Sequence, residues 1–350
     1  MTQDPSSEPA THLTEVVLPG VVEPDGLVVN RRPVPMPTGG QALVEMLATG
    51  VSFAERGMRH NRYPGQPKFP FVLGYDLVGI VTAVGPDADP ALVGRRVAAV
   101  TKTGGWTTHA LIDAHDLVLI PDGVDAAEAE TVVVNGITAW QMLHRKARVR
   151  PGQTILVHGA SGGVGNTLVQ LARHAGVRVI GTASPRHHDA LREMGAEPID
   201  YNDPSLSDRV RELAPDGVDA AFDHLGGASF ERSFGLLASG GTLVAYGTAA
   251  QLNDTNNLIL TFVSLYARLG LWSLLPNRRR ALFYNFWGGK LIRPARFRKR
   301  LASDLTDVLS LLADGSVTPH VAARIPLRDA SRAMTLAESG TIYGKVVLVP

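Results

Sequence analysis

A glycine-rich turn is the segment of this sequence whose residues point most directly to a chemical task. It follows the apolar run Gln153–His158, a short predicted strand, and precedes a predicted helix that ends near Ala175. The small residues would let the backbone approach a pyrophosphate, and the free N–H groups and dipole of the helix would attract its charge. The predicted cofactor-binding residues of this turn are Ala160, Ser161, Gly162, Gly163, Val164 and Gly165. The alternative is a glycine-rich turn without a ligand.

The end of the next predicted strand indicates which dinucleotide is bound. After Val177–Thr182 come Ser184 and Arg186, with no Asp or Glu before Asp189. A carboxylate here would hold the ribose hydroxyls of NAD, whereas a hydroxyl and a guanidinium suit the 2′-phosphate of NADP. We therefore predict NADPH as the cofactor. Tyr201 either reaches that phosphate or only packs behind a strand, and Gly247 is a further candidate contact.

The elements that must position this turn divide the chain into two parts. The first third is rich in short β-type segments, which suggests a barrel-like domain: Thr14–Leu18, Ala42–Thr49, Leu77–Val84, Arg96–Val100 and Leu117–Ile120. A helical stretch from Asp125 to His144 follows. Beyond it, strands alternate with helices, as in parallel βαβ units: strands at Val218–Phe222 and Thr242–Tyr246, helices at His187–Met194 and Ser229–Leu237. A helix at Asp304–Leu312 and strands at Ala322–Pro326 and Lys345–Val349 return to the first domain.

Composition excludes several classes of protein. Hydrophobic residues make up 45% of the 350 residues and charged residues 19%, as in globular proteins. A net charge of +1 gives no overall field that would recruit nucleic acid, so none is expected as a partner. The absence of cysteine excludes disulfides, thiol nucleophiles and thiolate metal sites, and it is compatible with a cytoplasmic location. We expect residues 1–10 to form a disordered tail and not a signal peptide.

With these residues in view, the chain resembles the medium-chain dehydrogenase/reductase superfamily, in its quinone oxidoreductase-like branch. The matching motifs are Gly50–Arg56, Arg62-Tyr-Pro64, Leu73–Gly79, Val134–Ala139, the glycine-rich turn, Met194-Gly-Ala196, Asp200-Tyr201 and Gly344–Leu348. The resemblance implies an α/β protein with a GroES-like β-barrel catalytic domain, residues 12–134 and 304–350. It also implies a Rossmann domain with a doubly wound parallel sheet, residues 135–303, and a homodimer formed through the edge of that sheet.

Two departures from the superfamily concern zinc. The zinc-dependent branch has a cysteine after the first Gly-Val and a Gly-His-Glu motif, where this chain has Ser52 and Gly74-Tyr75-Asp76. We therefore predict no metal site. The quinone reductases usually carry an asparagine where Ser52 stands, so a hydrogen bond credited to that asparagine is not transferred to this chain.

Without a metal, other groups must handle charge when hydride arrives. A quinone or an α,β-unsaturated carbonyl delocalises the charge onto oxygen, so the protein has to orient the acceptor and supply a proton. Tyr63 is the candidate for hydrogen bonding or proton delivery, the alternative being a surface-loop aromatic. Ser52 is a second candidate for contact with the acceptor. Asn135, Thr138 and Lys345 are expected beside the cofactor, although helix capping and packing would explain the first two.

The expected function is thus NADPH-dependent hydride transfer to a small-molecule quinone or α,β-unsaturated carbonyl or enoyl acceptor, without zinc. The alternative is a family member that binds NADPH with little turnover and associates with a membrane or another protein.

A basic and aromatic segment at residues 255–303 bears on that choice. It holds ten Lys or Arg, no Asp or Glu, and eight of the 21 aromatic residues. Three interpretations remain open: a helical lid and dimer-flanking insertion, a cap whose basic residues attract a phosphate-bearing or carrier-linked acyl substrate, or a peripheral membrane patch. The apolar stretch Asn257–Pro276 is interrupted by Arg268, so we do not expect a transmembrane helix.

Overall fold

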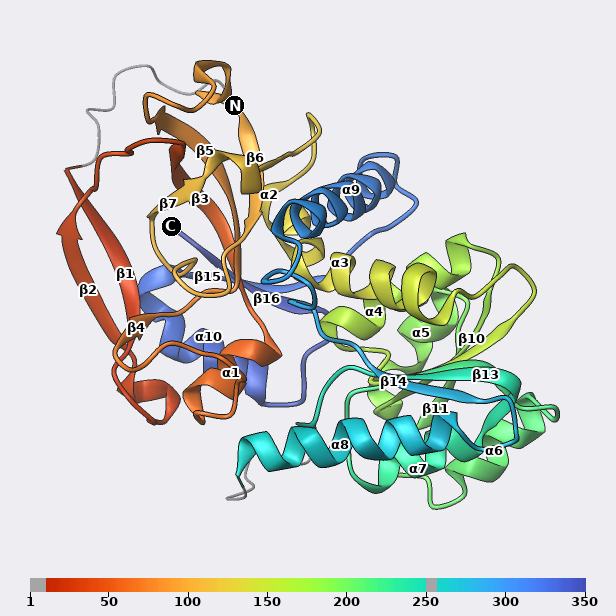
Figure 1. The fold of residues 1–350 in the computed structure, drawn as a ribbon. Helices are drawn as coiled ribbons and strands as arrows, with labels where there is room; N and C mark the ends of the chain where they lie inside the picture. The colour runs from red at the N-terminus through yellow and green to blue at the C-terminus, as the bar shows by residue number, and fades with distance from the viewer. Residues whose placement is uncertain (1–10, 250–256) are drawn as a thin grey trace.

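The computed structural model describes residues 11–249 and 257–350, so the expected tail lies outside the described residues. Two domains lie side by side (Figure 1): a β-rich domain built from both ends of the chain, and an α/β domain built from its middle. The C-terminal strand β16 (Lys345–Val349) runs through the region where the two domains meet. The predicted α/β architecture is confirmed.

The β-rich domain contains a seven-stranded sheet in the order β15-β16-β3-β5-β6-β8, with β7 beside β3, and a three-stranded sheet β2-β1-β4. Its remaining strands are β1 (His12–Leu18), β2 (Val28–Pro33), β3 (Gln41–Val51), β4 (Phe71–Val72), β5 (Asp76–Val84), β6 (Arg96–Val100), β7 (His109–Asp113), β8 (Val118–Leu119) and β15 (Val321–Pro326). Helices α1 (Phe53–Arg59), α2 (Ala126–Val132) and α10 (Ala330–Glu338) belong with them. Five of these strands, β1, β3, β5, β6 and β8, lie where the sequence predicts them, whereas β2, β4 and β7 were not predicted.

The α/β domain is a six-stranded parallel sheet in the order β11-β10-β9-β12-β13-β14. The strands are β9 (Thr154–His158), β10 (Arg178–Ala183), β11 (Glu197–Asp200), β12 (Val218–Asp223), β13 (Leu237–Ala245) and β14 (Arg280–Phe283). Both faces are apolar because neighbouring residues of a strand point in opposite directions: Ile155 and Val157 pack in one core cluster and Leu156 in another. The predicted doubly wound sheet is therefore observed.

Helices cover the two faces of this sheet. They are α4 (Gly163–His174), α5 (His188–Glu193), α6 (Leu206–Leu213), α7 (Ala228–Gly235) and α8 (Leu258–Ser273), while α3 (Val134–Trp140) continues into a π-helical turn, Gln141–Ala147. Buried residues of α4 and α5 pack in the cluster with Ile155, and buried residues of α6, α7 and α8 pack in the cluster with Leu156. The single predicted helix from Asp125 to His144 is thus broken into α2, α3 and the π turn.

The basic and aromatic segment is not only an insertion beside the sheet, because it contributes a strand to it. Its strand β14 is the sixth strand of the parallel sheet, and its outer edge pairs with no described strand. This is the edge at which the family resemblance implies a homodimer, and the dimer stays a prediction. No helix in residues 11–249 or 257–350 is long and apolar enough to cross a membrane.

Helix α9 (Pro294–Ala313) begins ten residues before the helix predicted at Asp304. The domain boundary predicted at residue 304 therefore falls inside one continuous helix. Asp304 is fully buried, and its carboxylate accepts hydrogen bonds from Gln141 Nε2 at 2.6 Å and Arg145 Nε at 2.9 Å. These bonds tie α9 to the π turn, so the two predicted domains share this helix.

Candidate active site

The glycine-rich turn joins β9 to α4 as predicted. A Cβ atom at Gly165 would lie 2.1 Å from the carbonyl oxygen of Gly159, so only glycine lets the helix pack this closely on the turn. A Cβ at Gly162 would meet nothing closer than 3.4 Å, and this glycine is exposed. The turn therefore presents open backbone beside the first N–H groups of a twelve-residue helix, which fits a pyrophosphate.

Two other segments hold this turn. A Cβ at Gly163 would lie 2.4 Å from Asn135 Nδ2, which places the Asn135 amide against the start of α4. The backbone N–H of Gly344 donates to the carbonyl of Ser161 at 3.0 Å. Thr138, one turn further along α3 than Asn135, is buried. Asn135 and the chain just before Lys345 thus lie beside the turn, and the contact of Asn135 and Thr138 with the cofactor stays a prediction.

The residues predicted at the 2′-phosphate lie at the carboxyl end of β10. Arg186 is exposed, and its Nε donates to Ser184 Oγ at 3.1 Å. The backbone N–H of Tyr201 donates to Ala183 O at 3.2 Å, which holds Tyr201 next to Ser184 with its side chain 54% exposed. Gly247 follows β13 at the same end of the sheet, where a Cβ would lie 2.9 Å from His224 O.

His187, which directly precedes α5, is buried. Its ring lies 5.6 Å from that of Tyr343, and its Nε2 has no hydrogen-bond partner. A buried polar atom without a partner costs free energy unless a bound group satisfies it. This atom, with Ser184 and Arg186, fits the site to a dinucleotide that carries an additional phosphate.

On the other side of the domain junction, three aromatic side chains form a hydroxyl-linked cluster. The hydroxyl of Tyr63 lies 2.5 Å from that of Tyr75, and the indole Nε1 of Trp287 donates to the Tyr75 hydroxyl. Burial raises the pKa of both tyrosines, so both hydroxyls keep their protons at neutral pH. Sequence reasoning found Tyr63 but not Trp287, because nothing local to the sequence shows that β14 is followed by a return to the first domain.

Ser52 begins α1 and is bonded to a carboxyl group that the sequence analysis did not single out. Its N–H donates to Glu55 Oε2 at 2.9 Å, its Oγ contacts the same oxygen, and Glu55 Oε1 accepts from the N–H of Tyr75 at 2.8 Å. Glu55 therefore links the two positions at which the zinc-dependent branch has Cys and His. Burial raises the pKa of Glu55 to about 7. The Ser-x-x-Glu spacing of a helix capping box was the available signal.

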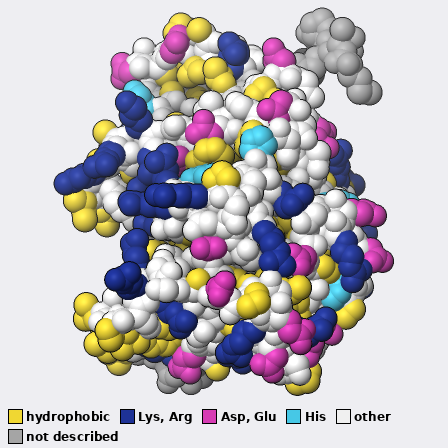
Figure 2. Space-filling view, turned by 90° about the vertical axis from the view of Figure 1, so that its right-hand side faces the viewer, with side chains coloured by type: hydrophobic (Ala, Val, Ile, Leu, Met, Phe, Trp, Pro, Cys, Tyr) yellow, Lys and Arg dark blue, Asp and Glu magenta, His cyan; other side chains and the backbone are white. Residues whose placement is uncertain are grey.

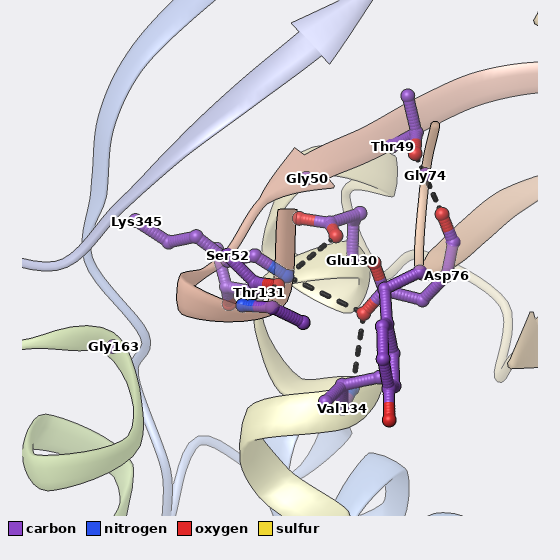
Figure 3. Close-up of polar contacts among 12 residues, drawn as sticks. Thr49, Gly50, Ser52, Gly74, Asp76, Glu130, Thr131, Val134, Gly163 and Lys345 are labelled. Atoms are coloured by element: carbon purple, nitrogen blue, oxygen red, sulfur yellow. Dashed lines mark hydrogen bonds and ion pairs between the residues drawn. The ribbon is translucent and has the colours of Figure 1, made fainter. Parts of the chain in front are cut away.

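Lys345 lies in the junction itself, and its side chain points to two carboxylates of the β-rich domain (Figure 3). Its Nζ lies 2.7 Å from Glu130 Oε1 and 3.3 Å from Asp76 Oδ2, and all three residues are buried. Burial alone would lower the pKa of Lys345, but Asp76 and Glu130 outweigh it and raise that pKa. Lys345 thus contributes a fixed positive charge, and its predicted contact with the cofactor stays a prediction.

The same cluster requires Gly50 and positions α3. A Cβ at Gly50 would lie 2.2 Å from Lys345 Cε and 2.3 Å from Glu130 Oε1. The same Asp76 Oδ2 that faces Lys345 also accepts from the N–H of Val134 at 3.1 Å, at the start of the helix that carries Asn135. No group of three or more His, Cys, Asp or Glu in the described ranges has a geometry that could hold a metal ion.

Replacing Lys345 with methionine should destabilise the protein by about 3–5 kcal/mol, because it leaves two buried carboxyl groups without their cation. Burial raises the pKa of Glu130, and without the opposing ammonium this carboxyl would fold protonated. The folded state would bind more protons, so the loss should be larger at pH 8 than at pH 5. Urea denaturation at both pH values measures it.

The matched control is Lys345→Met combined with Glu130→Gln, which should recover part of the loss at pH 8. An equal loss at both pH values would contradict the electrostatic explanation and leave only lost packing.

Comparisons with known proteins agree with this geometry. Residues 38–122 match the family described as alcohol dehydrogenase GroES-like domain, and residues 163–280 match the family described as zinc-binding dehydrogenase. The chain is 31% identical to the synaptic vesicle membrane protein VAT-1 homolog of Homo sapiens over 344 residues. The aligned region covers 96% of this chain and 86% of that protein.

Two solved structures extend the likeness to the whole fold. A mycobacterial protein complexed with NADPH is 29% identical, with a TM-score of 0.82 over 97% of this chain and 100% of that one. The quinone oxidoreductase of Escherichia coli complexed with NADPH is 25% identical, with a TM-score of 0.84 over 96% and 100%. With its GroES-like and Rossmann domains joined at the site described above, the chain belongs to the medium-chain dehydrogenase/reductase superfamily, in the quinone oxidoreductase-like branch.

Proposed function

We propose that this protein is an NADPH-dependent reductase that transfers hydride, without zinc, to a quinone or an α,β-unsaturated carbonyl compound. The main support for this proposal is the short chain of contacts that connects the tyrosine cluster with the glycine-rich turn. Tyr75 precedes Asp76, whose carboxylate accepts from Val134 N, and Asn135 then lies against Gly163 of the glycine-rich turn. A dinucleotide on that turn and an acceptor at the tyrosines would therefore share one junction.

Binding of NADPH in particular is supported by the acid-free end of β10 and by two relatives. Ser184 and Arg186 are bonded to each other and accessible there. The mycobacterial and Escherichia coli structures that this chain resembles are both complexes with NADPH. The cofactor would supply the hydride.

The residues of this chain would hold the acceptor and supply a proton. Tyr63 keeps its proton because burial raises its pKa, and its contact with Tyr75 fixes the position of its hydroxyl oxygen. A hydrogen bond from Tyr63 would stabilise the negative charge that develops on the acceptor oxygen. Trp287, which is bonded to Tyr75, would form part of the wall against which a planar acceptor lies.

The direct test measures NADPH oxidation with a panel of quinones and enones, in the wild type and in Tyr63→Phe. We expect turnover with some acceptors, and a fall in kcat of about 10²-fold in the variant, the lower end of what a positioned proton donor contributes. Tyr266→Phe is the control, because Tyr266 lies on α8 with 47% exposure. If NADPH binds but no acceptor in the panel speeds its oxidation, the proposed reductase activity is refuted.

The cofactor preference is tested by Arg186→Ala. Loss of one charge-assisted contact with the 2′-phosphate should weaken NADPH about 10- to 100-fold and leave NADH nearly unchanged. Calorimetric titration with both dinucleotides measures this. Arg192→Ala is the control, since Arg192 is an exposed residue of the same helical region and is paired with Asp189. Equal losses for NADPH and NADH in Arg186→Ala would argue against the assignment.

A second candidate function, association with an anionic membrane surface, is favoured by one specific observation. Leu291 is 98% exposed and Ile292 83%, and Lys290 and Arg293 flank them in the chain. Exposed aliphatic side chains between cations suit a lipid surface of negative charge. A human relative of this chain is named a synaptic vesicle membrane protein.

Flotation with liposomes containing anionic lipid should therefore recover the wild-type protein but not Leu291→Ser combined with Ile292→Ser. Val21→Ser with Met36→Ser is the control, because these side chains are also exposed, at 62% and 79%, and lie in the other domain. If the first pair changes the sedimentation coefficient instead of flotation, the aliphatic pair belongs to a contact between two copies of the chain.

A further inference from the structure

The indole of Trp287 has two lysines from different domains close to its ring. Lys102 Nζ is 5.9 Å from the centre of the Trp287 ring and 5.9 Å from that of Tyr63. Lys290 Nζ is 4.5 Å from the Trp287 ring. Because Tyr63 and Trp287 both bond to Tyr75, the two ammonium groups stand beside the proposed acceptor site.

Neither lysine has a carboxylate partner within 4 Å among the described residues. Lys102 Nζ donates to the carbonyl of Gly65, which leaves most of its hydrogen-bonding capacity unused. Asp116 lines a recess with Lys290, but its carboxylate is bonded to Arg298 at 2.8 Å. Two like charges held near each other without an acid cost free energy, and an anion would recover it.

The position of Lys102 is fixed by the backbone. Its φ of +70° lies in the left-handed region, which residues other than glycine seldom adopt. Its N–H and that of Thr101 both donate to the carbonyl of Tyr75, at 3.0 and 2.9 Å. Backbone strain of this kind is retained when surrounding structure enforces it, and it is concentrated at functional sites. Lys102, which follows β6, is thus held against the backbone of Tyr75, which precedes β5.

The pKa of Lys102 is shifted in the direction that a bound anion would reverse. Burial lowers the pKa of Lys102, and the nearby charge of Lys290 lowers it further. The groups that face this lysine are Lys290, Tyr63 and Trp287, none of which carries a negative charge at neutral pH.

We propose that Lys102 and Lys290 bind an anionic group, a phosphate or a carboxylate, on the tail of the acceptor. The enzyme would then prefer acceptors whose reducible double bond is attached to a negatively charged tail over neutral quinones or enones. This inference rests on the proposed reductase function and names the substrate class of the same site. Tyr63 would contact the reacting end, and the two lysines would hold the far end.

The test compares acceptors that share a reacting group, where one member of each pair carries a negatively charged tail and the other a neutral one. One pair is a 2-alkenoyl thioester of coenzyme A and the same thioester of N-acetylcysteamine, and the other is a 4-oxo-2-alkenoic acid and its methyl ester. The wild type should show a lower KM for the charged member of at least one pair. The pair that shows it tells whether phosphate or carboxylate is recognised.

In Lys102→Met combined with Lys290→Met, the KM for the charged acceptor should rise about 10- to 100-fold while kcat and the neutral acceptor change little. Lys102→Arg with Lys290→Arg should restore most of the preference, because it keeps both charges. Lys299→Met is the control, an exposed lysine of the same segment. An equal rise in KM for charged and neutral acceptors would overturn the proposal and assign the lysines to packing.

A binding measurement keeps the inference separate from the reductase itself. Coenzyme A and a 4-oxo-2-alkenoic acid are titrated against the protein saturated with NADP⁺, with tryptophan fluorescence as the readout. Quenching by either ligand that disappears in the double methionine variant supports the site even if no acceptor is turned over, an outcome that would refute only the reductase. No quenching by either ligand, or quenching that persists in the variant, refutes the anion site.

Discussion

The buried charge cluster at the domain junction is the constraint on which the rest of the site depends. Lys345 arrives on the last strand, Glu130 on α2 and Asp76 on β5, and burial of all three is tolerable only while the ammonium stays between the carboxylates. Asp76 also binds the first N–H of α3. The cluster therefore holds the C-terminal strand and the β-rich domain in a fixed position relative to the helix that contacts the glycine-rich turn. Only glycine fits at position 50, because any side chain there would collide with the cluster.

This arrangement explains how the fold works with other residues at the zinc positions. Ser52 and Tyr75 hold no metal ligand atoms of the usual kind, and the carboxyl of Glu55 links them through Ser52 N and Tyr75 N. The side chain of Tyr75 is bonded instead to the Tyr63 hydroxyl and the Trp287 indole, at the proposed acceptor site. Neutral donors suit an acceptor that stabilises much of its own negative charge, and this is the physical reason for proposing a quinone or a conjugated carbonyl compound over a simple ketone.

Much of this was accessible from the sequence, and what was missed has a common physical cause. The turn at 159–165, the strands β6 and β16 and the acid-free end of β10 are local patterns, so periodicity and residue type predicted them. The strand β14, the early start of α9 and the contact of Trp287 with Tyr75 depend on residues more than 200 positions apart or on tertiary packing. Glu55 stood within a quoted motif, but its burial and raised pKa arise only when Tyr75 is folded over it.

The segment after α8 is best understood from these long-range contacts. A simple insertion would leave the sheet and the junction intact without it, yet β14 completes the sheet and Phe286 and Trp287 pack against core clusters of both domains. The basic residues of this segment lie in two different environments. Arg298 and Arg300 are engaged by Asp113, Asp116 and Gly288 O and serve structure, whereas Lys290 stands beside Trp287 without an acid partner within 4 Å in the described chain. The same stretch therefore completes the Rossmann sheet with β14 and then brings Lys290 to the Trp287 ring, which Lys102 approaches from the other domain at the proposed acceptor site.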